Sequence, residues 1–245
     1  LQTAHPDLSA NVNTAIDWDF NFDDNDPNPG TGDDHGTACA GVAAARGNNG
    51  LGVSGSAPEA TLVGLRLISL ASSDSEEADA MNWSNHIIQL KSNSWGPNDN
   101  GATLEGPGAL TRAALSNACI LGRGGRGILN FWAGGNGLDA NDDSNYDGYA
   151  NSIYTIAIGA VANTGIQSWY SESGANLVVV APSSGDNNSG SDVGIWTTDR
   201  TGSSGYSTTD YANDFGGTSS ATPLAAGVGA LVLQANTNLG WRDVQ

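Results

Sequence analysis

The chain has 245 residues, with eight lysines and arginines against 26 aspartates and glutamates, so its formal charge is −18. Nucleic acid and anionic membrane surfaces are disfavoured as partners, because both need a cationic protein face. No apolar run approaches the roughly 18 residues of a membrane span, and the composition is that of a packed chain rather than a disordered one. The acidity suits metal ions or basic peptides as partners, or it only keeps the protein soluble.

Continuous apolar runs, typical of buried strands, are interspersed along the chain with segments whose composition favours helices. In order, the sequence predicts a helix over 36–46, a strand over 61–68, helices over 74–83 and 108–121, strands over 128–133, 153–161 and 177–181, and a helix over 219–235. The apolar runs do not alternate, which indicates strands buried on both faces, and the last helix is apolar almost all round, which indicates burial. This order predicts an α/β fold with a mostly parallel sheet and helices on both faces. The polar stretches 183–192 and 201–214 are expected to be loops.

Two glycine-rich segments place one polar side chain each at a helix or strand end. DDHGTACAG, residues 33–41, puts His35 at the start of a close-packed helix, where a lone histidine is more often structural than catalytic. FWAGGNG, residues 131–137, ends a buried strand with Asn136, at the edge where open α/β sheets bind ligands. The Asn136 amide can donate to a developing oxyanion there, or it can simply occupy a turn.

A third segment carries a candidate nucleophile. GGTSSATPLAAG, residues 216–227, makes a tight turn and then opens the buried helix with Ser219. The Ser219 hydroxyl lies near backbone N–H groups and the positive end of the helix dipole. An isolated serine at such a position is usually only an N-cap.

In the order His, Asn, Ser, the three segments together resemble the subtilisin-like serine peptidases. The stretches NSWGPNDNG, NYDGYANSIYTIAIGA, WYSE and NLGWRDVQ narrow the resemblance to the kexin/furin-like branch, the proprotein convertases, over nearly the whole chain. The resemblance implies a subtilisin-like three-layer fold, with residues 1–245 forming one catalytic domain. It also implies a secreted enzyme that acts on polypeptides as a monomer.

The resemblance implies a role for each of the three side chains. Ser219 is the nucleophile, His35 its general base, and Asn136 with the Ser219 backbone N–H forms the oxyanion hole. In the family a triad aspartate precedes the segment that reads LQTAHPDL here, and Asp7, Asp17 and Asp19 do not sit in its motif. We therefore expect a sequence that is truncated at both ends and lacks its first strand, and that is nearly inactive and poorly folded on its own.

The resemblance also implies cleavage after basic residues, often paired. Asp99 and Asp147 match the pocket for the residue before the scissile bond, where an unpaired buried cation would be costly. A more distant subsite is matched by Glu77, Glu105 and Tyr149. The neighbouring subsite is matched by Asp33 or Asp34, and the spacing before His35 leaves the choice between them open.

Calcium is the second use that the resemblance implies for the acids. One site is matched by Asp7 and Asn49. A third, beside the basic pocket, is matched by Asp99, Glu172 and Asp142, and the adjacent Asp143 is an alternative to Asp142. A second site is matched by Asp19, Asp26 and Asn28, in a loop where Asp24 could substitute and which could equally be a solvated turn.

The sequence leaves two other hypotheses about function open. One is a catalytically silent, acidic calcium-binding module on the same scaffold, and the other is a subtilase of broad specificity. The two cysteines, Cys39 and Cys119, are expected to be structural thiols, and nothing in the sequence supports a disulfide between them.

Overall fold

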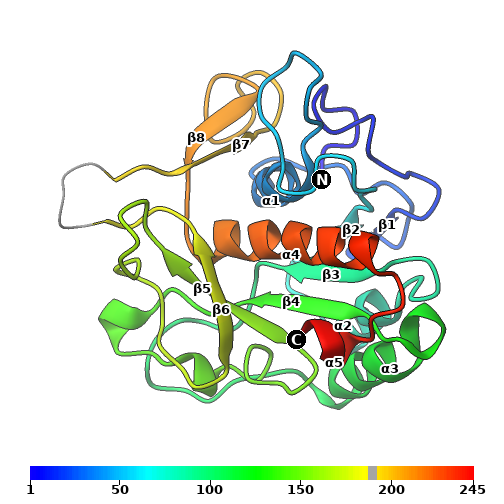
Figure 1. Ribbon diagram of the computed structural model, residues 1–245, viewed down its shortest axis with the longest axis vertical. Coiled ribbons are helices and arrows are strands. Elements are labelled where there is room, and N and C mark those ends of the chain that lie inside the picture. Colours follow the sequence, from blue (N-terminus) through cyan, green and yellow to red (C-terminus); the bar gives the residue numbers. More distant parts are fainter. Residues whose placement is uncertain (187–191) are drawn as a thin grey trace.

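The computed structural model describes residues 1–186 and 192–245, arranged around a parallel sheet (Figure 1). The strands are β1 (Trp18–Asp19), β2 (Leu65–Arg66), β3 (Leu90–Asn93), β4 (Leu129–Ala133), β5 (Ile156–Val161), β6 (Leu177–Pro182), β7 (Ile195–Thr198) and β8 (Tyr211–Phe215). The helices are α1 (His35–Ala44), α2 (Asp74–Asn82), α3 (Ala109–Gly125), α4 (Thr218–Ala235) and α5 (Trp241–Val244). No helix in the described part of the chain is long and apolar enough to cross a bilayer.

The main sheet has the strand order β3-β4-β5-β6, and all of its pairs are parallel. β1 and β2 form a separate parallel pair, and β7 and β8 an antiparallel hairpin beside α1. A groove of about 1410 Å³ lies between α1, β2 and β3. The sequence predicts a strand over 61–68, but only Leu65–Arg66 pairs as a strand, so β2 is much shorter than expected.

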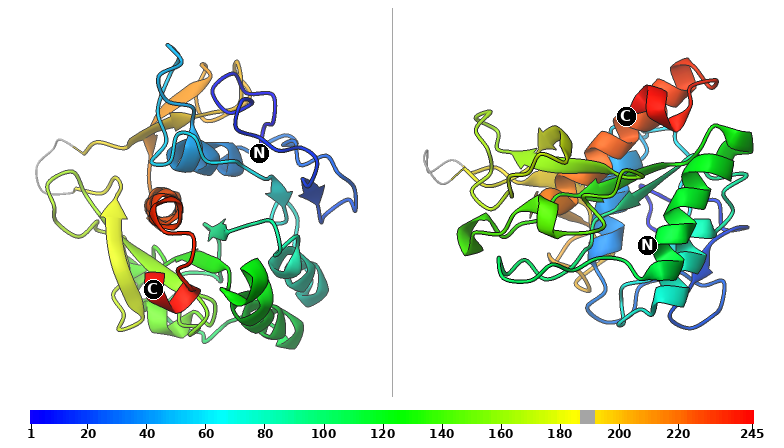
Figure 2. Two further views of the ribbon diagram at one scale, coloured as in Figure 1. Left: turned by 45° about the vertical axis from the view of Figure 1, so that its right-hand side comes forward. Right: turned by 90° about the horizontal axis from the view of Figure 1, so that it is seen from below.

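Helices cover both faces of the main sheet, as predicted. Alternate residues of β4 point to opposite sides: Phe131 packs with α4, and Trp132 packs with Met81 of α2 and Leu115 of α3. The left view of Figure 2 looks nearly along α4, which lies in the middle of the molecule between α1 and the sheet. The three-layer α/β architecture is confirmed.

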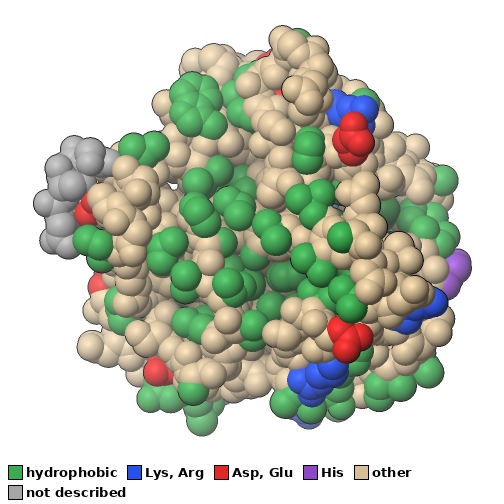
Figure 3. All heavy atoms as spheres, in the orientation of Figure 1, with side chains coloured by type: hydrophobic (Ala, Val, Ile, Leu, Met, Phe, Trp, Pro, Cys, Tyr) green, Lys and Arg blue, Asp and Glu red, His purple; other side chains and the backbone are tan. Residues whose placement is uncertain are grey.

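Two predictions of burial were wrong in part. Val178, Val179 and Val180 of β6 are 43–50% exposed, because β6 is the edge strand of the sheet and has a neighbour on one side only. α4 also leaves Val228 and Leu231 more than 40% exposed. Figure 3 shows the resulting apolar area, over α4 and β6 in the middle of one face.

Strand ends and helix starts meet at one edge of this fold. β3 and β4 run parallel, so the segments after Asn93 and Ala133 leave the sheet on the same side. The N-termini of α1 and α4 lie at that edge too, because Cys39, one turn into α1, contacts the first turn of α4. The three motifs of the sequence therefore converge at a single place.

Candidate active site

His35 and Ser219 are brought together by Cys39. His35 is the first residue of α1, and its Nδ1 lies 3.7 Å from the Cys39 sulfur. The same sulfur lies 3.6 Å from the carbonyl oxygen of Ser219, the second residue of α4. Ser94, just after β3, donates a hydrogen bond of 3.0 Å to that carbonyl. The predicted nucleophile and base thus share one edge of the sheet, with both side chains half-buried.

The His35 ring is turned toward the Cys39 thiol. The pKa of His35 is raised, because the neighbouring Cys39 sulfur and the Asp33 carboxylate favour the charged ring more than burial disfavours it. Within residues 1–186 and 192–245, the imidazole makes no hydrogen bond to a carboxylate or to the Ser219 hydroxyl. The ring also packs edge-on against Phe215, with the ring centres 5.6 Å apart.

Asn136 is fixed against the start of α4 by its side-chain oxygen. Its Oδ1 accepts hydrogen bonds from the Thr218 backbone N–H, at 2.7 Å, and from the Thr218 hydroxyl, at 3.0 Å. The amide group of Asn136 is therefore held one residue from Ser219. Gly217 precedes the helix with a φ of +73°, a conformation that favours glycine and lets the chain enter α4 beside Asn136.

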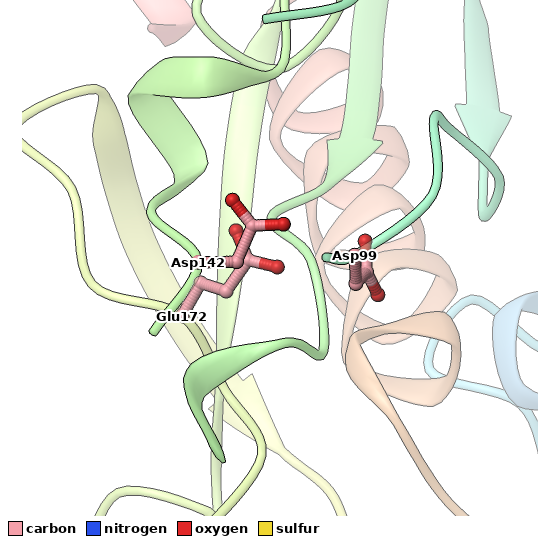
Figure 4. A group of neighbouring side chains, drawn as sticks. All are labelled: Asp99, Asp142 and Glu172. Carbon is pink, nitrogen blue, oxygen red and sulfur yellow. The ribbon is translucent and has the colours of Figure 1, made fainter. Parts of the chain in front are cut away.

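Three carboxylates surround the loop that carries Asn136. Oxygen atoms of Asp99, Asp142 and Glu172 all lie within 4.8 Å of one another, and Figure 4 shows Asp142 and Glu172 side by side with Asp99 across the loop. Asp99 accepts a hydrogen bond of 2.9 Å from the Asn136 N–H, and Glu172 accepts one of 2.9 Å from the Gly137 N–H. The acids thus hold the loop from both sides.

Glycine is required where this loop passes between the acids. A Cβ at Gly135, whose φ is +101°, would collide with the Glu172 carboxylate. A Cβ at Gly137 would lie 2.8 Å from the side chains of both Asp99 and Asp142. The spacing of GGNG is therefore set by the carboxylate cluster as much as by the turn.

The cluster carries more negative charge than its surroundings balance. Burial, together with repulsion from its neighbours, raises the pKa of Glu172 to about 7 and also raises the pKa of Asp99. In the described ranges no lysine or arginine forms an ion pair with Asp99, Asp142 or Glu172. Oxygen ligands converging from three separate loops, with excess negative charge, fit a hard divalent cation.

Asp147 lies close to this cluster but faces a different loop. Its Oδ1 accepts a hydrogen bond of 2.6 Å from the Tyr149 N–H, and its Oδ2 lies 3.1 Å from the position that a Cβ on Gly96 would take. Burial first, and then repulsion from Asp99 and Asp142, raises the pKa of Asp147 to about 6. Asp147 therefore offers one carboxylate oxygen to a cation that enters beside the loop of residues 94–97 (SWGP).

Glu77, Glu105 and Tyr149 line one pocket of about 640 Å³ together with Trp95 and Gly96. Glu77 is buried and accepts hydrogen bonds from the Tyr149 hydroxyl, at 2.7 Å, and from the Ser72 hydroxyl, at 2.9 Å. Glu105 is exposed. The residues of the predicted distant subsite thus share a pocket, in which Glu105 is the acid free to meet a ligand.

Asp33 and Asp34 immediately precede His35, but both are already paired with arginines. Asp33 accepts a hydrogen bond of 2.8 Å from Arg66 Nε, and Asp34 lies 3.1 Å from Arg200 Nη1. Sequence reasoning did not find these partners.

The predicted calcium residues of the N-terminal region form pairs rather than full clusters. Asp7 is fully buried and accepts a hydrogen bond of 2.6 Å from the Asn49 side chain, so these two lie together. Asp26 and Asn28 also hydrogen-bond to each other. Asp19 instead forms an ion pair with Arg66. The first and second calcium sites stay predictions.

Comparison with known proteins decides the family. The model of the Subtilase family (Peptidase_S8) matches residues 1–245. The chain belongs to the subtilase family. Furin-1 of Xenopus laevis is 40% identical over 249 aligned residues, covering all of this chain and 30% of that protein. Human proprotein convertase subtilisin/kexin type 4 is 41% identical over 249 aligned residues, which cover all of this chain and 32% of that protein.

Solved structures agree with the fold of this subtilase. A serine protease of Aeromonas sobria matches with a TM-score of 0.86 at 24% identity, over 99% of this chain and 47% of that one. A psychrophilic protease named S41 matches with a TM-score of 0.72 at 23% identity, over all of this chain and 77% of that one. The chain spans about a third of the length of the two curated relatives named above.

Proposed function

We propose that this subtilase is a serine endopeptidase of the proprotein convertase branch that cleaves polypeptides after basic residues. The observation that supports it most is the meeting of His35, Asn136 and Ser219 at one sheet edge, beside carboxylates that no lysine or arginine of the described chain neutralises. The convertases among its relatives, at about 40% identity, support the branch.

The chemistry follows from the three side chains. The Ser219 Oγ attacks the carbonyl carbon of the scissile bond while His35 takes the hydroxyl proton. The tetrahedral oxyanion is stabilised by the Asn136 amide and by the Ser219 backbone N–H at the start of α4. His35 then gives its proton to the leaving amine, and a water molecule hydrolyses the acyl-enzyme in the reverse sequence.

Turnover by the 245-residue chain is expected to be low. A carboxylate on the far side of the imidazole holds the ring in the productive tautomer and stabilises its charge, and losing it lowers kcat by roughly 10⁴-fold. In the described chain the His35 Nδ1 faces the Cys39 thiol instead. Binding of substrate and the oxyanion donors remain, so weak hydrolysis should still be measurable.

The preference for a basic residue rests on Asp147 and Asp99. The pKa of Asp147 is raised by burial and by like charges, an unfavourable state that a bound guanidinium would relieve. Glu105 offers a second carboxylate, in the more distant subsite, with Glu77 and Tyr149 forming its wall. Basic residues at the first and a more distant position therefore fit this surface.

Calcium is the cofactor that the carboxylates fit. Asp99, Asp142 and Glu172 would hold one ion, and the bound charge would relieve the repulsion around the loop of Asn136. Asp7 with Asn49, and Asp26 with Asn28, are candidate ligands of further ions. Calcium is far more abundant outside the cytoplasm than inside it, so we propose an extracytoplasmic location.

Hydrolysis of matched peptides tests this proposal. Two peptides differing only in arginine or alanine before the cleaved bond are incubated with the protein in calcium, and the products are identified by mass spectrometry. We expect cleavage after arginine, lost in Ser219→Ala. Cleavage that survives in Ser219→Ala overturns the mechanism, no cleavage at all favours the silent calcium-binding module, and equal cleavage of both peptides favours a subtilase of broad specificity.

A further inference from the structure

The acids around the candidate active site fall into two groups by their partners. Asp147 and the cluster of Asp99, Asp142 and Glu172 have no cationic partner among the described residues. Asp33 and Asp34, which immediately precede His35, each contact an arginine of the same chain. A cationic substrate side chain gains most from a carboxylate that has no partner yet, so the two groups should differ in what they bind.

Arg200 is held on Asp34 by several contacts. It follows β7, and its own backbone N–H donates a hydrogen bond of 2.8 Å to the Asp199 carboxylate. Its Nη1 lies 3.1 Å from Asp34 Oδ1 and donates a hydrogen bond of 2.7 Å to the Gly30 carbonyl. The side chains of Arg200 and Asp34 are only 16% and 15% exposed. The guanidinium is therefore fixed, and the pair is screened by solvent less than a surface ion pair.

Arg66 holds Asp33 in the same way from the other side. Its Nε donates a hydrogen bond of 2.8 Å to Asp33, and its Nη1 pairs with Asp19, a carboxylate that is almost fully buried. The Arg66 side chain is 12% exposed. Removing Arg66 would leave the Asp19 charge buried and unpaired, which would destabilise the fold. The ion pair of Arg200 with Asp34 is therefore the one that a substitution can break without this cost.

We propose that Arg200 is a specificity-determining residue: by occupying Asp34, while Arg66 occupies Asp33, it makes the subsite beside His35 accept uncharged side chains. Under the proposed function the first residue of the substrate lies at Asp147, and the resemblance to the convertases implies that the second residue lies at Asp33 and Asp34, beside His35. The second residue thus meets carboxylates whose charge is already balanced. The protein selects a single basic residue before the cleaved bond rather than a basic pair. This inference rests on the proposed endopeptidase function.

Matched peptides that vary only the second position test it. All carry arginine at the first position, and the second is alanine, lysine or glutamate; kcat/KM is measured for each. The wild type should cleave the lysine peptide no better than the alanine peptide. Arg200→Gln should raise the lysine-to-alanine ratio about three- to tenfold, since it frees Asp34. Arg46→Gln, which breaks a peripheral ion pair with Glu59, is the control and should leave the ratio unchanged.

A second variant does not depend on the folding of Arg200→Gln. Asp34→Asn frees the Arg200 guanidinium, so the glutamate-to-alanine ratio should rise by about the same factor. An unchanged ratio in this variant overturns the inference. So does a wild type that already prefers lysine at the second position by more than threefold.

The proposed function is judged on a different comparison. Replacing arginine by alanine at the first position tests the basic-residue pocket, and a wild type indifferent to that change contradicts the proposed function. A wild type that requires arginine at the first position but prefers lysine at the second contradicts only the role of Arg200.

Discussion

Replacing Asp147 by asparagine should remove the preference for arginine without unfolding the protein. The Oδ1 of the new side chain can still accept the Tyr149 N–H that Asp147 binds at 2.6 Å, so the loop keeps its hydrogen bond. What is lost is the negative charge beside Gly96. Hydrogen bonds to a charged group are worth about 1.5–3 kcal/mol. We therefore expect kcat/KM for the arginine peptide to fall about 10- to 150-fold.

Thermal unfolding supplies an independent readout of the same variant. Burial, with repulsion from Asp99 and Asp142, raises the pKa of Asp147 to about 6, so the ionised carboxylate is unfavourable in the free protein. The neutral asparagine should leave the melting temperature unchanged or raise it. A loss of arginine cleavage combined with equal or higher stability identifies a residue kept for binding rather than for folding.

The control is a carboxylate in a similar local role far from the site. Asp243 accepts the Gly240 N–H at 2.8 Å at the start of α5, and Asp243→Asn should change neither kcat/KM nor the arginine preference. Cleavage of the alanine peptide should be unaffected in Asp147→Asn. If Asp147→Asn keeps the wild-type ratio of arginine to alanine cleavage, the assignment of the pocket to Asp147 is wrong.

Three further variants test other parts of the account. Asn136→Ala should lower kcat about 100- to 1000-fold with little change in KM; an unchanged kcat would remove Asn136 from the oxyanion hole. Calcium should raise the wild-type melting temperature, whereas Glu172→Gln should abolish most of that rise and melt higher than wild type in EDTA, because it removes a charge that is buried and repelled by Asp99 and Asp142. Burial lowers the pKa of Lys91 to about 7 from 10.5, so between these values the unfolded chain binds a proton that the folded chain lacks. Stability should then rise with pH, by up to about 1.4 kcal/mol per unit, and urea unfolding at pH 7 and 9 should show this slope absent in Lys91→Met.

The helices and strands that could be predicted from the sequence are those formed by continuous runs of apolar residues. β4 and α4 were predicted because their apolar residues are continuous, and both lie in the core around Phe131. β3 could not be found this way, since it contains Lys91 and Asn93, both buried. Lys91 donates hydrogen bonds to the carbonyls of Ala80 and Met81 at the end of α2, partners that no local pattern reveals.

The candidate site shows the same division. His35, Asn136 and Ser219 could be named because each stands in a short motif at the end of a strand or start of a helix. The partners of Asp33 and Asp34 could not, because Arg66 and Arg200 lie 33 and 166 residues away along the chain. β7 and β8 place Arg200 beside α1, and β8 falls in a stretch whose polar composition predicted only a loop.

Covalent labelling with a fluorophosphonate tests most directly whether Ser219 is a nucleophile activated by His35. Mass spectrometry of the labelled protein should find a single adduct, on Ser219, formed slowly in the wild type and many-fold more slowly in His35→Ala. An adduct on any other residue, or a labelling rate indifferent to His35→Ala, would contradict the account.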